Sequence, residues 1–186
     1  MNVWLTSDHH FGHANLLTFQ DRDGAYFRGN RFSSIEEMDE YMVARWNSLV
    51  KPDDKVYHLG DFAMGLKRHS LDIANRLNGR KVLIRGNHDK LKLSQYAEHF
   101  KDVRATHMLS TGVGSPCSHL VLSHVPIHPR SLGAGWVNVH GHTHEKGSPP
   151  GPYVSVCVEM TDYLPLRLDS VTALAHLAAG QRDWMD

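Results

Sequence analysis

Five short polar segments, each placed where a predicted strand ends, limit the folds that this sequence can adopt. One of them, Gly-Asn-His-Asp at residues 86–89, follows the apolar run at residues 81–85. The other four are Asp8-His9-His10, Gly60-Asp61, Ser123-His124 and Gly141-His142-Thr143-His144. In open α/β sheets, sites form in the crevice beyond the carboxyl ends of the strands. The pattern therefore predicts a fold in which five strand ends converge.

The first half of the chain alternates between strand and helix patterns. Residues 3–7, 55–59 and 81–85 are typical of buried strands. A capping-box spacing at Ser34 and Glu37, followed by apolar residues at helical intervals, predicts a helix over residues 34–49. A second helix is expected from about His69 to Leu77. This order predicts parallel strands joined by right-handed crossovers.

The second half has closely spaced strand patterns without obvious helices between them. Strands are predicted at residues 103–109, 119–123, 136–140, 153–158 and 164–168, with a hairpin-type connection at 111–116 and a mobile surface loop at 147–152. Ser170 is expected to cap a final helix over residues 171–179. The predicted fold class is α/β, a single domain over residues 1–186. Its two packed sheets are flanked by helices, the first sheet mostly parallel and the second mostly antiparallel.

Composition excludes several classes of protein. The 186 residues carry 20 Lys and Arg against 20 Asp and Glu, so a broad basic surface for long nucleic acids is not expected. The chain has no apolar run of about 18 residues and no basic leader, which predicts a cytoplasmic protein without membrane contact. Cys117 and Cys157 are too few for a disulfide framework, and we expect both to be reduced packing residues.

Each polar segment alone has an ordinary explanation, because Asp8 could cap a helix and Gly60-Asp61 could form a turn. Together they offer carboxylates, imidazoles and a side-chain amide but no thiolate, which suits Mn, Fe, Co, Ni or Zn ions. His142 and His144 alternate on an extended segment and so point the same way. One metal ion rarely needs seven protein ligands. Two ions that share one carboxylate could use all seven.

The ordered motifs resemble those of the calcineurin-like metallophosphoesterase superfamily and span residues 8–144. Residues 6–13 and the segment from residue 32 onward further resemble a group of small bacterial and phage phosphoesterases. The resemblance implies a four-layer α/β/β/α sandwich. It also implies two divalent metal ions per chain (Mn²⁺, Fe²⁺ or Fe³⁺, Ni²⁺, Co²⁺ or Zn²⁺), with Mn²⁺ preferred in vitro.

The resemblance assigns roles to individual residues. Asp8, His10 and His144 would hold the first metal ion, and Asn87, His124 and His142 the second, with Asp61 bridging the two. His88 would lie over the substrate as the catalytic acid. The implied reaction is hydrolysis of a phosphodiester or phosphomonoester by in-line attack of a metal-bridging hydroxide. The expected partner is a phosphate ester, with nucleotides and nucleic-acid ends among the candidates, and no protein partner is evident.

Several residues near these motifs have weaker assignments. His9 and His13 could contact substrate or support the metal ligands. Arg28, Arg31 and Arg85 could grip a phosphate through bidentate contacts, although an arginine beside a strand end more often forms a surface ion pair. Asp89 could orient His88 or cap a helix. The remaining histidines within regular elements are expected on the surface or as satisfied core residues: His58, His69, His99, His107, His119 and His176.

Two alternatives to a two-metal hydrolase predict sequence features that are absent here. A binding or scaffold protein that had kept this fold without catalysis should lack some ligands or the histidine of the Gly-Asn-His-Asp segment, and this sequence lacks none of them. A single-metal zinc hydrolase of another fold predicts a compact pair such as His-Glu-x-x-His, which does not occur here. The residues between His13 and Phe32 are the expected specificity loop.

Overall fold

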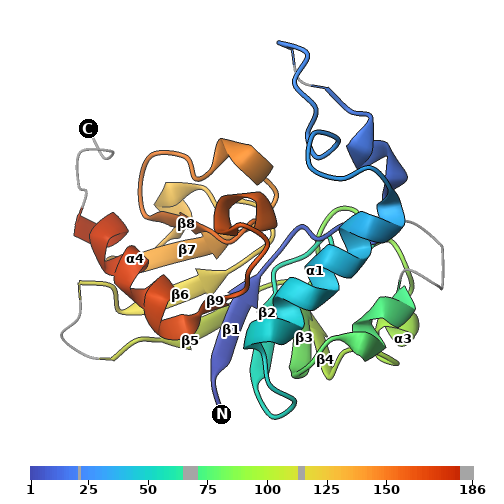
Figure 1. The fold of residues 1–186 in the computed structure, drawn as a ribbon. Helices are drawn as coiled ribbons and strands as arrows, with labels where there is room; N and C mark the ends of the chain where they lie inside the picture. Colours follow the sequence, from blue (N-terminus) through green and yellow to red (C-terminus); the bar gives the residue numbers. More distant parts are fainter. Residues whose placement is uncertain (21, 65–70, 113–115, 181–186) are drawn as a thin grey trace.

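The computed structural model describes residues 1–20, 22–64, 71–112 and 116–180. It confirms the predicted fold class, because two mixed sheets pack together with helices around them (Figure 1). The five-stranded sheet has the order β4-β3-β2-β1-β9. Its strands are β1 (Val3–Thr6), β2 (Lys55–His58), β3 (Arg80–Ile84), β4 (Asp102–Arg104) and β9 (Leu166–Arg167). The pairs β1–β2, β2–β3 and β3–β4 are parallel, and β9 is antiparallel to β1.

The four-stranded sheet corrects one expectation. Its order is β5-β6-β7-β8, and only the β5–β6 pair is antiparallel, so the sheet is mostly parallel. The strands are β5 (His107–Ser110), β6 (His119–Leu122), β7 (Trp136–His140) and β8 (Tyr153–Ser155). Parallel pairs need long crossovers. Here the crossovers contain only the short 3₁₀ turns η3 (Pro129–Ser131) and η4 (His144–Lys146), which leave no helical pattern in the sequence.

A second correction concerns the strand expected at residues 103–109. The structure breaks it at residues 105–106, so that β4 completes one sheet and β5 begins the other. Ala105 and Thr106 therefore carry the chain from the first sheet to the second. An apolar alternation cannot reveal this switch, because the pattern is the same on either side of the break.

The most secure helix prediction is confirmed by α1 (Ile35–Leu49). Ser34 caps it by accepting the Glu37 N–H at 3.1 Å, and the Glu37 carboxylate accepts the Ser33 N–H in return. Residues 69 and 70 of the second predicted helix lie outside the described residues, and its remainder contains the 3₁₀ turn η2 (Ile73–Arg76). The one-turn helix α3 (Leu93–Tyr96) and the 3₁₀ turns η1 (Ala14–Leu17) and η5 (Val158–Thr161) were not predicted.

The final helix, α4 (Leu168–Gly180), begins earlier than predicted. Ser170 lies inside its first turn and is not the cap. Strand β9 ends at Arg167 and the helix starts at the next residue, so the chain has no loop residue there to act as a cap. In the described part of the chain, the longest and most apolar helices still fall short of what crossing a bilayer requires.

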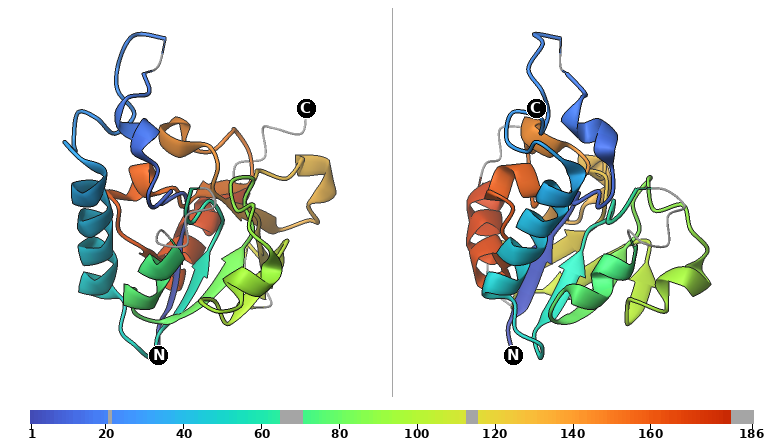
Figure 2. Two further views of the ribbon diagram at one scale, coloured as in Figure 1. Left: turned by 90° about the vertical axis from the view of Figure 1, so that its right-hand side faces the viewer. Right: turned by 45° about the vertical axis from the view of Figure 1, so that its right-hand side comes forward.

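The first sheet is buried on both faces, which fixes the layers. Trp4, Val56 and Leu83 point into a core shared with α1, whereas their neighbours Leu5 and Val82 join a second core. The second core lies between the two sheets and beneath α4. The loops after β1, β2 and β3 consequently face the loops after β6 and β7 (Figures 1 and 2).

Candidate metal centre

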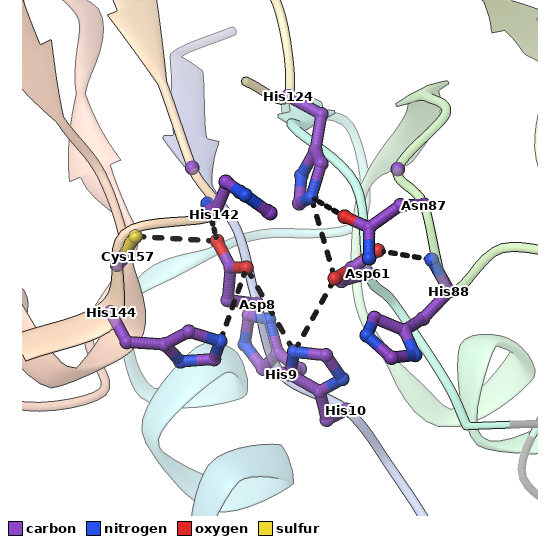
Figure 3. Close-up of polar contacts among 12 residues, drawn as sticks. Asp8, His9, His10, Asp61, Asn87, His88, His124, His142, His144 and Cys157 are labelled. Carbon is purple, nitrogen blue, oxygen red and sulfur yellow. Dashed lines mark hydrogen bonds and ion pairs between the residues drawn. The ribbon is translucent and has the colours of Figure 1, made fainter. Parts of the chain in front are cut away.

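The five polar segments meet at one place, above the junction of the two sheets (Figure 3). Asp8 and His10 follow β1, Asp61 follows β2, Asn87 and His88 follow β3, His124 follows β6, and His142 and His144 follow β7. Two groups of side chains each bring their ligand atoms within 4.8 Å of one another. The first group is Asp8, His10 and His144, and the second is Asp61, His124 and His142.

Asp61 lies between the two groups. Its Oδ2 is 3.6 Å from His10 Nε2 of the first group and 3.3 Å from His124 Nε2 of its own group. Asn87 belongs with the second group, because its Oδ1 is 2.8 Å from His124 Nε2. One carboxylate oxygen thus faces a histidine from each side, which is the position that a shared metal ligand needs.

In both Asp8 and Asp61, one carboxylate oxygen accepts hydrogen bonds from the protein and the other faces the centre. Asp8 Oδ2 accepts the His142 N–H at 2.9 Å and the Cys157 thiol at 3.3 Å, while Oδ1 is buried without a hydrogen-bond partner. Asp61 Oδ1 accepts the His88 N–H at 2.8 Å, which leaves Oδ2 for the two histidines. Burial raises the pKa of Cys157 to about 12, so its sulfur is a thiol donor here and not a thiolate ligand.

The unpartnered atoms fit a cation. Both ring nitrogens of His10 are buried without a hydrogen-bond partner, and burial lowers its pKa well below the usual value, so its ring is neutral. His124 Nδ1 donates to the Leu59 carbonyl at 2.8 Å, so Nε2 faces the oxygens of Asp61 and Asn87, and the Asp61 carboxylate outweighs burial and raises the pKa of this ring. Facing acceptors of this kind require a proton or a metal ion between them. Neutral imidazoles and carboxylates are the protonation states that bind metals.

The backbone is held in an unfavourable conformation at five of the candidate ligands. Seven non-glycine residues in the described part of the chain have positive φ, and five of them belong to the centre: Asp8 (62°), His10 (51°), Asp61 (54°), His142 (72°) and His144 (50°). A non-glycine residue in this region costs of order 1–3 kcal/mol. Such outliers cluster at functional sites, where the strained backbone aims a side chain that a relaxed one would direct elsewhere.

Two glycines permit the close approach of the loops. A Cβ on Gly86 would lie 2.2 Å from Asp61 Oδ1, and a Cβ on Gly141 would lie 2.4 Å from Asp8 Oδ2. Both distances are far inside van der Waals contact. The glycine that precedes Asn87 and the glycine that precedes His142 are therefore needed so that the aspartates of other loops can reach the centre.

A residue that sequence reasoning missed, Glu159, supports the first group from behind. Its Oε1 lies 2.9 Å from His144 Nδ1 and accepts two donors of Arg28 at 2.5 and 3.0 Å. Burial opposes ionisation of Glu159, but the Arg28 guanidinium and His144 hold its pKa down at about 2. Glu159 thus accepts a hydrogen bond from the His144 Nδ1–H, and this contact turns His144 Nε2 toward Asp8 Oδ1, 3.8 Å away. The only signal was an acidic residue directly after the apolar run at 153–158.

Sequence comparisons place this chain in a family. No family model matches the chain. It is 30% identical over 181 residues to the uncharacterized protein MJ1445 of Methanocaldococcus jannaschii, covering 92% of this chain and 90% of that one. The chain belongs to the MJ1445 family. It is also 30% identical over 169 residues to the gene 66 protein of Mycobacterium phage L5, with 77% of each chain covered.

Among solved structures, the protein of unknown function AQ665 from Aquifex aeolicus has a TM-score of 0.68 and 23% identity, and covers 93% of this chain and 98% of its own. This likeness shows that the MJ1445-family chain shares its fold. An archaeal phosphodiesterase aligns at a TM-score of 0.46 and 18% identity over 84% of this chain and 82% of its own, which is too distant to bear on function.

In this MJ1445-family protein, the prediction that Arg28 binds a phosphate of the substrate is wrong. Its side chain has no exposed surface, and its guanidinium donates to the carbonyl oxygens of Asp8 at 2.7 Å and His9 at 2.8 Å as well as to Glu159. All of these contacts are internal. Arg28 therefore holds the loop after β1 in place and cannot grip a phosphate.

The other two arginines also bind protein groups. Arg85 donates to the carbonyl oxygens of Asp89 at 2.6 Å and Leu91 at 3.2 Å, which fixes the loop after β3. Arg31 pairs with Asp162 at 2.8 Å and lies 4.8 Å over the ring of Tyr163. In this structure, both guanidinium groups are therefore engaged by protein groups and not by the centre.

The remaining predicted residues fall behind or beside the centre. Asp89 neither touches the His88 ring nor caps a helix, and its carboxylate accepts the N–H groups of Asp61, Phe62 and Gly86, which ties two ligand loops together. His9 is fully buried, with Nδ1 2.9 Å from Nε2 of the core residue His58, so it cannot contact substrate.

Two histidines stand beside the candidate ligands. The ring of His88 lies edge-on to His10 at 5.3 Å, and the ring of His13 lies 5.9 Å from His10. His88 is partly exposed, and its Nδ1 is buried without a hydrogen-bond partner. Both side chains lie beside the ring of His10, a candidate ligand of the first group.

Proposed function

We propose that this protein is a phosphoesterase of the calcineurin-like metallophosphoesterase type, which hydrolyses phosphodiesters, phosphomonoesters or both with two divalent metal ions. The observation that supports it best is the pair of ligand groups, each with a carboxylate and two imidazoles, that meet at Asp61 Oδ2. The proposed ligands of the first ion are Asp8, His10 and His144, and those of the second are Asn87, His124 and His142. Asp61 serves both.

The donor set narrows the choice of metal. Nitrogen and oxygen donors without a thiolate favour Mn, Fe, Co, Ni or Zn over soft ions, and we propose Mn²⁺ for activity in vitro. When bound, two such ions would supply positive charge for the phosphoryl oxygens and a lowered pKa for water beside them.

The side chains of the protein do the positioning. Glu159 and the Leu59 carbonyl orient His144 and His124 so that the other ring nitrogen of each faces the centre. Asp61 is held from two directions, by the His88 N–H at its Oδ1 and by Asp89, which accepts the backbone N–H of Asp61 itself. The geometry is thus set before a substrate arrives, which reduces the reorganisation that the reaction requires.

His88 is the proposed acid. It is partly exposed beside His10 and is not a member of either ligand group. Its imidazolium would transfer a proton to the oxygen of the leaving group as the phosphorus–oxygen bond breaks. A positioned acid of this kind contributes about 10²–10⁴-fold to the rate.

The test is His88→Ala, with the exposed His128→Ala as the matched control. After chelator treatment and reloading with manganese, nickel, iron or zinc, both variants should bind two ions per chain. Turnover of alkyl phosphate esters by His88→Ala should fall by about 10²–10⁴-fold, and turnover of p-nitrophenyl esters much less, because a good leaving group needs little protonation. Equal losses on both esters would remove the acid role. Two bound ions without turnover of any ester by the wild-type protein would favour a binding protein.

A further inference from the structure

A hairpin-like loop between β1 and α1 carries all the exposed large aromatic side chains of the described residues. We call residues 19–20 and 22–27 the aromatic arm. The exposed fractions are 45% for Phe19, 44% for Tyr26 and 39% for Phe27, whereas every other described Phe, Tyr and Trp is buried or half-buried. Isolated exposed apolar residues are normal on protein surfaces. The three exposed rings lie within nine residues of one projecting loop, and this concentration needs an explanation.

The arm is a defined structure. Gln20 and Tyr26 form an antiparallel bridge, and the Phe27 N–H donates to the Phe19 carbonyl at 3.0 Å. At the root of the arm, the Arg28 N–H donates to the Leu16 carbonyl at 3.2 Å. Figures 1 and 2 show this loop standing out from the body of the molecule at the end of the sheets where the strands β1 and β2 finish.

The root of the arm is fixed to the loop that carries two candidate metal ligands. The Arg28 guanidinium is buried and binds the carbonyl oxygens of Asp8 and His9. This contact ties the position of the arm to the position of the centre. The root of the arm is therefore held beside the loop that carries Asp8 and His10.

A continuous path of rings joins the centre to the arm. His13 lies 5.9 Å from the ring of His10, and Phe19 lies edge-on to His13 at 5.8 Å. His13 is nearly buried, so Phe19 is the first ring on this path with a large exposed surface. A ligand with its phosphate beside His10 and His88 would have its next chemical group over His13 and Phe19.

We propose that the aromatic arm stacks on the base of a nucleotide or of a nucleic-acid end whose phosphate occupies the metal centre. This inference rests on the proposed phosphoesterase function and names its substrate class. Aromatic side chains stack on any base, and each such contact is worth about 1–3 kcal/mol. The formal net charge of zero excludes affinity from a broad basic field, so a nucleotide must be held by local contacts such as these.

The test compares two diesters with the same leaving group: thymidine 5′-(p-nitrophenyl phosphate) and ethyl p-nitrophenyl phosphate. The wild-type protein should prefer the thymidine ester in kcat/KM by about five- to 100-fold. Phe19→Ala combined with Tyr26→Ala should reduce this ratio toward one, and Phe19→Trp should preserve it. Leu177→Ala, which removes an exposed apolar side chain from α4, is the matched control and should leave the ratio unchanged. Metal content should equal that of the wild type in every variant.

A binding measurement separates failure of this inference from failure of the proposed function. Titration of the manganese-loaded protein with thymidine 5′-monophosphate and with deoxyribose 5-phosphate reports base recognition without turnover. Tighter binding of the nucleotide that the double variant loses would support the arm even if no ester were hydrolysed. Equal kcat/KM for both diesters, or a base preference that survives the double variant, would overturn the inference while leaving the hydrolase intact. Self-association that the double variant abolishes, with no base preference, would identify the arm as a protein contact.

Discussion

The two ligand groups of the centre differ in how firmly the protein encloses them. In the first group, Asp8 and His10 are 0% and 2% exposed, and His144 is held from behind by Glu159. In the second group, His142 and Asn87 reach the centre from exposed positions, although His124 is buried against the Leu59 carbonyl. Enclosed ligands with fixed partners lose less freedom on binding and hold a metal ion more tightly. We therefore expect two classes of metal site, a tight one at the first group and a weaker, exchangeable one at the second.

The largest effect is expected where the two groups meet. Asp61→Asn replaces the carboxylate that faces both His10 and His124, so both sites should weaken. We expect metal content below two ions per chain by elemental analysis and a loss of turnover greater than about 100-fold, the upper end for residues that merely support a ligand. Asp162→Asn is the control, because Asp162 is also an aspartate with positive φ and lies in an exposed ion pair with Arg45. Two tightly held ions in Asp61→Asn would contradict the shared role.

The convergence of the candidate ligands was predictable from the sequence because they follow strand ends. A parallel sheet gathers the carboxyl ends of its strands at one edge, so Asp8, Asp61 and Asn87 had to lie near one another once the strands were recognised. The second sheet brought His124 and His142 to the same place for the same reason. Its mostly parallel pairing was missed, since the crossovers hold short 3₁₀ turns and no helices.

The supporting residues were not predictable in the same way. Glu159 and Arg28 are 131 residues apart, and neither stands in a motif. Arg28 was a candidate for phosphate binding, but its guanidinium is buried and binds two buried carbonyl groups. Contacts of this kind depend on the packing of η5 against the loop after β1, and local sequence patterns do not report such packing.

An intermediate effect should distinguish the two groups directly. Glu159→Gln keeps the shape of the side chain but removes the charge that backs His144. Metal affinity of the first group should fall by about 10–100-fold, while the second group keeps its affinity. Calorimetric titration of the chelator-treated protein with metal should show a tight and a weak binding phase. In Glu159→Gln, the affinity of the tight phase should fall toward that of the weak phase. Glu145→Gln, an exposed neighbour of His144, is the control and should change neither phase. A parallel weakening of both phases would mean that Glu159 acts on the fold as a whole.

The smallest effect is a pH dependence of stability in the metal-free protein. The folded-state pKa of Glu159 is about 2, below its usual 4.5, because Arg28 and His144 outweigh the effect of burial. A lowered pKa stabilises the fold fully above pH 4.5, and this contribution is lost as the pH falls toward 2. His144 stays protonated below pH 5.5, since the hydrogen bond to Glu159 outweighs burial and raises its pKa from 6.5.

Denaturant unfolding at pH 5.5 and pH 3 measures this contribution. The difference in unfolding free energy between the wild type and Glu159→Gln should narrow by on the order of 1–2 kcal/mol at the lower pH. Other carboxylates that respond to acid are present in both proteins, so their contributions cancel in the difference. If the difference in unfolding free energy between the two proteins is the same at both pH values, Glu159 stabilises the first group by its shape and not by its charge. The contrast between the two ligand groups would then rest on burial alone.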